Sequence, residues 1–155
     1  MQIEVKINGV LKKLETSPGE RLLDLLRRKG YKSVKRGCEE GECGACSIIL
    51  EGKLVKSCLI FAPQVSGHSI ITLEGLSPKG ELHPIQQAFL EEGAVQCGFC
   101  TPGMILATKV LLDKNPHPSE KEIKEAISGN LCRCTGYVKI VKAIKRVGET
   151  LNKNV

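Results

Sequence analysis

The chain has 155 residues, a formal net charge of +6 and 41% hydrophobic residues, a length that suits one domain or two small ones. Aromatic residues make up only 3% and Trp is absent, so a buried core has to rest on Ile, Leu and Val. The basic residues are dispersed and few aromatics could stack on bases, which argues against a nucleic-acid-binding protein. No apolar run approaches the roughly 18 residues that span a bilayer, which argues against a membrane protein.

The N-terminus and the cysteine content together bear on the cellular compartment. The first ten residues alternate apolar and polar types and lack the basic start and apolar run of a signal peptide. We therefore expect a cytoplasmic protein. Disulfides are disfavoured there, so the eight cysteines are expected to bind metal or to do redox chemistry.

Residues 1–75 are expected to form an α+β unit. Residues 3–7 alternate apolar and polar side chains, and Asn8-Gly9 is a strong signal for a tight hairpin turn into a returning strand. The remaining expected elements are a strand over 10–15, a helix from Leu22 that ends at Gly30, a hairpin over 47–57 around Glu51-Gly52, and a strand over 70–73.

Residues 76–155 have a helical pattern. Gly75, Pro78 and Gly80 indicate a connector between the two parts of the chain. The expected helices cover residues 84–92, 102–114, 119–128 and 136–151. Four helices in such a short segment predict a small bundle.

The first cysteine group has the spacing C-x4-C-x2-C-x11-C. Its members are Cys38, Cys43, Cys46 and Cys58. The first three match the spacing that plant-type ferredoxins use for a 2Fe–2S cluster. Glycines at 37, 41 and 44 let the loop wrap so that its amides turn toward the sulfurs. A four-cysteine zinc site is the rival reading, but its usual signature is a pair of C-x2-C knuckles.

The second cysteine group combines C-x2-C with C-x-C. Its members are Cys97, Cys100, Cys132 and Cys134. Thr101-Pro102 and Thr135-Gly136 follow the two pairs and predict that each pair lies just before a helix N-terminus. Helix N-termini favour thiolates and anionic cofactors. The spacing alone leaves zinc open at this group.

Three motifs carry a family resemblance that extends from Ile3 to about Leu151. They are GCEEGECGAC at 37–46, QCGFCTPGM at 96–104 and NLCRCTGY at 130–137. Together they resemble the small iron–sulfur subunit of the molybdenum hydroxylases. That family includes xanthine dehydrogenase, aldehyde oxidoreductase and carbon monoxide dehydrogenase.

The resemblance implies a fold and a set of partners. It implies a ferredoxin-like β-grasp domain over 1–75 and a four-helix bundle over 76–155, with one 2Fe–2S cluster in each. The implied function is electron transfer from a molybdenum–pterin centre to FAD or another acceptor. The chain has no room for molybdenum or flavin domains. A large molybdenum-binding subunit and a medium FAD-binding subunit are therefore expected, in a heterotrimer or a dimer of heterotrimers.

The resemblance also implies an order for the two clusters. Gln96 and Cys134 occupy positions that lie against the pterin in relatives, so the cluster of the second group is expected nearest molybdenum. The first group, with Glu39, Glu40 and Glu42 in its loop, is expected at a surface toward the acceptor. The alternative functions are a stand-alone ferredoxin-like carrier and a two-zinc interaction module.

Overall fold

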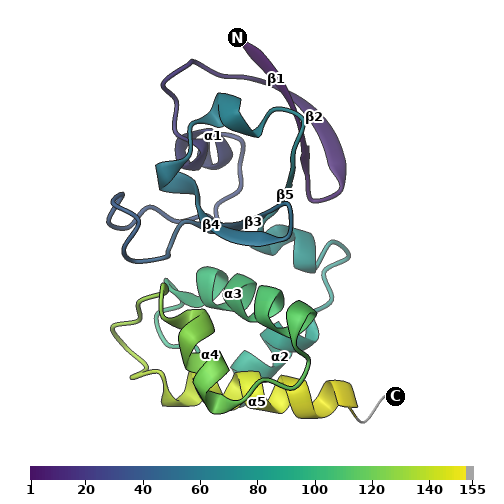
Figure 1. Cartoon of the computed structure of the whole chain (residues 1–155), viewed down its shortest axis with the longest axis vertical. Coiled ribbons are helices and arrows are strands. Elements are labelled where there is room, and N and C mark those ends of the chain that lie inside the picture. Colours follow the sequence, from purple (N-terminus) through teal and green to yellow (C-terminus); the bar gives the residue numbers. More distant parts are fainter. Residues whose placement is uncertain (153–155) are drawn as a thin grey trace.

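The computed structural model describes residues 1–152. A sheet-containing unit lies above a helical unit in Figure 1, with the N-terminus at the top and the C-terminal helix at the bottom. The strands are β1 (Gln2–Ile7), β2 (Val10–Glu15), β3 (Ser47–Leu50), β4 (Lys53–Lys56) and β5 (Ser69–Ile71). They form one sheet in the order β2-β1-β5-β3-β4, in which β1 and β5 pair in parallel and the other neighbours pair antiparallel.

The sheet unit buries the residues that the sequence pattern selects. Ile3, Val5 and Ile7 point inward from β1 and are at most 2% exposed. The turn at Asn8-Gly9 has positive φ at both residues, which confirms the predicted hairpin. Helix α1 (Leu22–Arg28) packs four buried leucines into the same core. The predicted hairpins and first helix are therefore confirmed.

The helical unit has its own core. Its helices are α2 (Pro84–Glu91), α3 (Thr101–Lys114), α4 (Glu120–Ile127) and α5 (Val138–Asn152). All four contribute buried side chains to a second hydrophobic cluster. Ser119 caps α4 in a reciprocal pair with Glu122, as the sequence predicts. The α+β class is confirmed by this combination of a mixed sheet and helices.

Three short 3-10 helices flank the strands, and two of them take over the last residue of an expected strand region, Ser57 and Leu73. Ser57–Leu59 follows β4, Ala62–Val65 precedes β5, and Leu73–Leu76 leads out of the sheet. Leu73 was expected in the last strand, but that strand ends at Ile71. The reason is that Thr72 leaves the sheet to bond the Asn8 side chain, at 2.9 Å for Thr72 N–H to Asn8 Oδ1.

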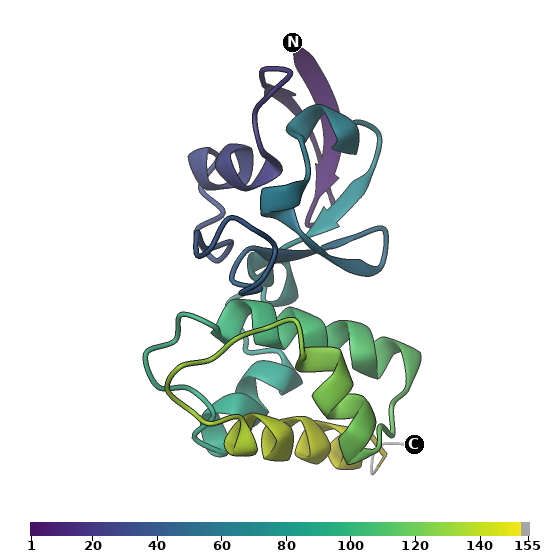
Figure 2. The same cartoon turned by 60° about the vertical axis from the view of Figure 1, so that its left-hand side comes forward.

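Helix α3 joins the two units. It lies directly against β3 and β4, and Figure 2 shows it running along the lower side of the sheet unit. Residues 102–108 are all buried, because α3 has sheet on one side and helices on the other. Gly103 lies so close to the first cysteine loop that a Cβ there would be 2.5 Å from the Gly44 carbonyl oxygen.

Within residues 1–152, none of the helices combines the length and the hydropathy that crossing a membrane requires.

Candidate metal centres

The first four cysteines come together at the edge of the sheet unit. Cys38, Cys43 and Cys46 lie in the long loop between α1 and β3, and Cys58 lies in the 3-10 helix after β4. Cys46 and Cys58 are buried, at 3% and 4% exposed, whereas the other two are half-buried. All four are free thiols.

Backbone amides of the loop converge on two of these sulfurs. The amides of Glu40 and Cys43 donate to Cys38 Sγ at 3.4 and 3.3 Å. The amides of Cys38 and Ala45 donate to Cys43 Sγ, both at 3.4 Å. Positive φ at Glu39, Gly41 and Gly44 turns the chain so that these amides face inward. The loop therefore forms an anion-binding nest around the thiols.

The pKa values of two of these thiols, Cys38 and Cys58, are shifted in opposite directions. The Glu40 amide and then the Cys43 amide lower the pKa of Cys38 to about 7. Burial, followed by the neighbouring Cys46 thiol, raises the pKa of Cys58 to about 11. A nearby positive charge is needed to keep the Cys58 thiol ionised at neutral pH, and a bound metal supplies such a charge.

The second four cysteines meet at one end of the helical unit. Cys97 and Cys100 precede α3, while Cys132 and Cys134 lie in the loop between α4 and α5. Cys134 Sγ lies 3.5 Å from Cys97 Sγ, and both residues are exposed. Cys100 and Cys132 are half-buried and also interact with each other. The structure thus brings together the four cysteines of each predicted group.

The predicted helix caps beside these cysteines are wrong in detail. Helix α3 begins at Thr101 with Cys100 in the capping position, and no side chain caps it. Helix α5 begins at Val138, because Gly136 and Tyr137 both have positive φ and cannot extend the helix backward. The Thr135 hydroxyl instead donates to Cys132 Sγ at 3.0 Å.

The C-terminal thiols also differ in their pKa values. Burial raises the pKa of Cys100 to about 12. Burial also opposes ionisation of Cys132, but hydrogen bonds from Thr135 outweigh it and lower that pKa. The Phe99 amide lowers the pKa of Cys97. The half-buried cysteines are Cys100 and Cys132, and the exposed ones are Cys97 and Cys134. In each of these two pairs, one thiol therefore ionises more readily than the other.

The sulfurs of each group lie in two pairs. In the first group, Cys38 contacts Cys43 and Cys58 contacts Cys46. The pairs in the second group are Cys97 with Cys134 and Cys100 with Cys132. Within residues 1–152, no three or more His, Cys, Asp or Glu side chains are arranged so that they could hold a single metal ion. Four thiolates in two pairs fit a two-iron cluster, in which each iron takes two protein ligands.

The two cysteine loops touch each other. The Leu131 amide, next to Cys132, donates to the Cys43 carbonyl oxygen at 2.8 Å. A hydrogen bond therefore links the backbones of the two cysteine-bearing loops, between residues that lie 88 positions apart in the sequence. A path from the Cys43 sulfur to the Cys132 sulfur therefore runs along covalent bonds and crosses between the loops at this one hydrogen bond.

Buried polar side chains hold that contact. Asn130, which is 2% exposed, donates from Nδ2 to the Gly44 carbonyl at 3.2 Å and to Ser47 Oγ at 3.3 Å. The Lys56 ammonium donates to the Gly129 carbonyl at 2.5 Å. Sequence reasoning assigned no role to Asn130 or Lys56. The signal in the sequence was that Asn130 is the first residue of the NLCRCTGY motif.

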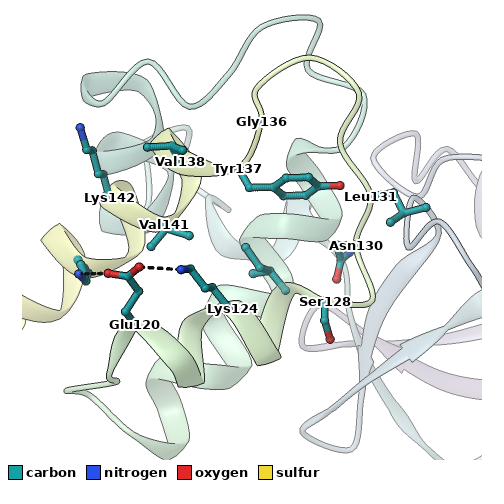
Figure 3. A pocket seen from close by; sticks show the side chains of 12 residues that line it. Glu120, Lys124, Ser128, Asn130, Leu131, Gly136, Tyr137, Val138, Val141 and Lys142 are labelled. Carbon is teal, nitrogen blue, oxygen red and sulfur yellow. Dashed lines mark hydrogen bonds and ion pairs between the residues drawn. The ribbon is translucent and has the colours of Figure 1, made fainter.

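A pocket of about 560 Å³ adjoins the C-terminal cysteine loop. It lies between α4, α5 and the loop that joins them, and Figure 3 shows Tyr137 across its upper part with Leu131 beyond the hydroxyl. The Tyr137 hydroxyl accepts a hydrogen bond from the Cys132 amide at 2.9 Å. One wall of the pocket therefore supports a cysteine of the second group. Leu131 and Val138, which line it, are 54% and 62% exposed.

Two further predicted residues are found at the surface. Gln96 is exposed, next to exposed Cys97, so Gln96 and Cys134 lie on the same side of the second cysteine group. Glu39, which was expected at the surface, is half-buried, and its carboxylate pairs with Arg21 at 3.2 Å and with Arg36. Glu40 and Glu42 are exposed.

Comparisons with known proteins match both halves of the chain. Residues 5–68 match the family model "2Fe-2S iron-sulfur cluster binding domain", and residues 72–145 match "[2Fe-2S] binding domain". The chain is similar to the nicotinate dehydrogenase small FeS subunit of Eubacterium barkeri. The two are 56% identical over 144 residues, which cover 92% of each chain.

Solved structures match nearly the whole length of this chain. Quinoline 2-oxidoreductase from Pseudomonas putida 86 has a chain that is 44% identical, with a TM-score of 0.94, covering 99% of this chain and 96% of that one. Aldehyde oxidoreductase from Desulfovibrio gigas also has a TM-score of 0.94, at 40% identity. It matches all of this chain with only 18% of its own length.

Proposed function

Because the chain belongs to the small iron–sulfur subunits of the molybdenum hydroxylases, we propose how its own residues bind two 2Fe–2S clusters and where its partners dock. Electron transfer within an oxidoreductase is the function of that family. The observation that carries the proposal is the grouping of eight free thiols into two sets of two pairs.

Each set holds one cluster. The N-terminal ligands are Cys38, Cys43, Cys46 and Cys58, and the C-terminal ligands are Cys97, Cys100, Cys132 and Cys134. Within each set, the two thiols of a contacting pair bind the same iron. A bound cluster supplies one-electron redox chemistry. The protein orients the thiolates, stabilises their negative charge through the amides on Cys38 and Cys43, and limits water at Cys46 and Cys58.

The contact between the two loops supports transfer from one set to the other. The hydrogen bond from the Leu131 amide to the Cys43 carbonyl shortens the route between them. The buried Asn130 keeps that route rigid by binding Gly44 and Ser47. A connection made mostly of covalent bonds, with one hydrogen bond, suits an internal electron relay.

The C-terminal set faces a molybdenum-bearing partner in this proposal. Cys97 and Cys134 are the exposed pair of the C-terminal set, and exposed Gln96 lies beside Cys97, so this end of the set is the one that a partner chain can reach. Gln96 and Cys134 are therefore proposed as pterin contacts. The N-terminal set lies toward FAD or another acceptor. The partners are a large molybdenum-binding and a medium FAD-binding subunit, in a heterotrimer or a dimer of heterotrimers.

Exposed apolar side chains around the C-terminal set favour a subunit over a stand-alone carrier. Phe99 is 46% exposed, and Leu131 and Val138 are exposed by more than half. A freely diffusing carrier gains nothing from such a surface, whereas a subunit interface buries it. We also assign the sheet unit, residues 1–75, to the β-grasp class and the helical unit, predicted over residues 76–155, to four-helix bundles. Residues 153–155 of that predicted unit lie outside the described residues. The cytoplasmic location expected from the sequence stays a prediction.

Single ligand substitutions test the two sets. Cys43→Ser should remove or alter one reduced-state EPR signal, and Cys132→Ser should do so for the other, with each variant leaving the remaining signal intact. Zinc without acid-labile sulfide in anaerobically purified native protein would instead support the two-zinc module. Mass spectrometry of co-purifying chains separates a subunit from a stand-alone carrier.

The proposed order of electron transfer, from the C-terminal set to the N-terminal set, has to be tested in the assembled complex. With Cys43→Ser in that complex, substrate should still reduce molybdenum and the C-terminal set while flavin reduction slows. Normal flavin reduction in rapid-mixing spectroscopy would contradict the order.

A further inference from the structure

Lys35 reaches from one cysteine loop to the other. Its backbone belongs to the N-terminal loop, where the Lys35 amide donates to the Ala45 carbonyl at 3.0 Å. Its ammonium donates to the Gly98 carbonyl at 3.2 Å, between Cys97 and Cys100. The same ammonium lies 5.2 Å from the centroid of the Phe99 ring. One side chain thus contacts both residues that separate the cysteines of the C-x2-C motif.

We propose that Lys35 is a positioning residue that makes the C-terminal cysteine set easier to reduce by placing a positive charge against its Cys97–Cys100 loop. The proposal rests on the ligand sets proposed above, because it assumes that the C-terminal set holds a cluster. It goes beyond them by assigning an electrostatic role to a residue that supplies no ligand.

The charge of Lys35 is not neutralised by a nearby carboxylate. No ion pair within 4.0 Å joins Lys35 to an acidic side chain anywhere in residues 1–152. Lys35 is also half-buried, so water screens its charge less than at an open surface. A carbonyl oxygen and the face of an aromatic ring both favour a cation without cancelling it.

Accepting an electron adds one negative charge to the C-terminal set and releases no proton in this step. In a redox titration that electron comes from dithionite, and in the enzyme it comes from the partner's substrate-oxidising centre. A positive charge within about 10 Å, acting through an effective dielectric constant of about 20, favours the added charge about tenfold. Lys35 contributes this effect most strongly at Cys97 and Cys100, because its ammonium points away from its own loop.

The fixed position of the ammonium matters as much as its charge. The Lys35 amide ties its backbone to Ala45, between Cys43 and Cys46 near the end of the N-terminal loop. The Gly98 carbonyl and the Phe99 ring then hold the far end of the side chain. Lys35 therefore holds the two cysteine loops at a fixed distance from each other. Its positive charge stays beside the C-terminal loop.

Three variants test the proposal in the full chain with its clusters. Lys35→Met keeps the aliphatic stem but removes the charge, and Lys35→Arg keeps the charge. Lys12→Met is the matched control, because Lys12 also lies over an aromatic ring, Tyr31 at 5.5 Å, but on β2. The readout is an EPR-monitored redox titration, with the two signals assigned by Cys43→Ser and Cys132→Ser.

Lys35→Met should make reduction of the C-terminal set about tenfold less favourable, which is about 59 mV lower for a one-electron couple. The N-terminal set should shift less, Lys35→Arg should stay near wild type, and Lys12→Met should shift neither signal. Equal shifts in both sets, an unshifted C-terminal set in Lys35→Met, or a shift of the same size in Lys35→Arg would overturn the proposal. Iron and sulfide contents of each variant separate this result from failure of the ligand assignment, since loss of the proposed clusters would appear there.

Discussion

Gly44 stands where the two cysteine loops touch, and it has no room for a side chain. A Cβ at Gly44 would lie 2.4 Å from the Gly129 carbonyl oxygen and 2.9 Å from Asn130 Cα, both of which are backbone atoms. Its φ of 75° also lies in the left-handed region, where a non-glycine residue costs about 1–2 kcal/mol. Glycine at this position is therefore required twice, by space and by backbone conformation.

We predict that Gly44→Ala destabilises the chain by about 2–5 kcal/mol, the sum of left-handed strain and overpacking. Thermal unfolding followed by circular dichroism should show a midpoint about 5–20 °C lower. Gly52→Ala is the control, because Gly52 has a similar φ of 76° and no heavy atom lies within 4 Å of its Cβ position. Equal losses in the two variants would show that the contact between loops contributes nothing.

Tyr137 supports Cys132 through a single hydrogen bond. Its hydroxyl accepts from the Cys132 amide at 2.9 Å, and no other residue of the loop can replace a ring of that length. Tyr137→Phe leaves this half-buried amide unpaired, at a cost of about 1–3 kcal/mol. We therefore expect the C-terminal set to lose its iron several-fold faster in the presence of a chelator.

The decay of visible absorbance and of the two EPR signals measures this effect. The signal assigned to the C-terminal set should decay faster while the other keeps its wild-type rate. Tyr31→Phe is the control, because Tyr31 packs against the core of the sheet unit. An unchanged decay in Tyr137→Phe would rule out the proposed support.

At the scale of elements, local periodicity predicted most of the fold. The alternation in residues 3–7 and the Asn8-Gly9 turn specify the first hairpin, because both signals depend on neighbouring residues alone. The same holds for the capping box that starts α4. These elements form where local preference and tertiary packing agree.

The elements that sequence reasoning missed depend on distant partners. The last strand ends early because Thr72 bonds Asn8, 64 positions away. Helix α5 starts late because Tyr137 adopts positive φ while its hydroxyl holds Cys132. At the candidate site, the motifs predicted the two cysteine groups, but the pairs within them depend on how each unit folds. The contacts of Asn130 and Lys35 arise only when the two units pack together.

The segment Leu73–Leu76 fastens the connector to the sheet unit through one carboxylate. Glu74 accepts hydrogen bonds from the Ser33 amide at 3.0 Å, from the Ser33 hydroxyl at 2.5 Å and from the Thr72 hydroxyl at 2.6 Å. Burial opposes ionisation of Glu74, but these hydrogen bonds outweigh it and lower the pKa below the ordinary value of 4.5.

This lowered pKa gives a pH dependence with a defined sign. Ionised Glu74 stabilises the fold fully above about pH 4.5, and that stabilisation is lost as pH falls through the lower folded-state pKa. Glu74→Gln should therefore unfold at lower urea concentration than wild type at pH 7, and the difference should shrink toward pH 4. A difference that stays constant over this range would contradict the assignment.

At the scale of the whole molecule, two small cores share one interface, and the two cysteine loops meet at it. Each core alone is small, and α3 is the element that both units bury. The cysteine loops lie at that interface, so cluster binding and the packing of the two units should reinforce each other. Cys97, Cys134 and Gln96 are exposed, and the proposed function assigns this end to a partner chain.

The most direct test of the two-cluster assignment is a combined count of metal, sulfide and electrons in anaerobically purified protein. Eight thiolates at four per cluster predict about four iron atoms and about four acid-labile sulfides per chain. Dithionite should then deliver about two electrons per chain and produce two distinct EPR signals. Half of that iron and sulfide with one signal, or zinc without sulfide, would contradict the account.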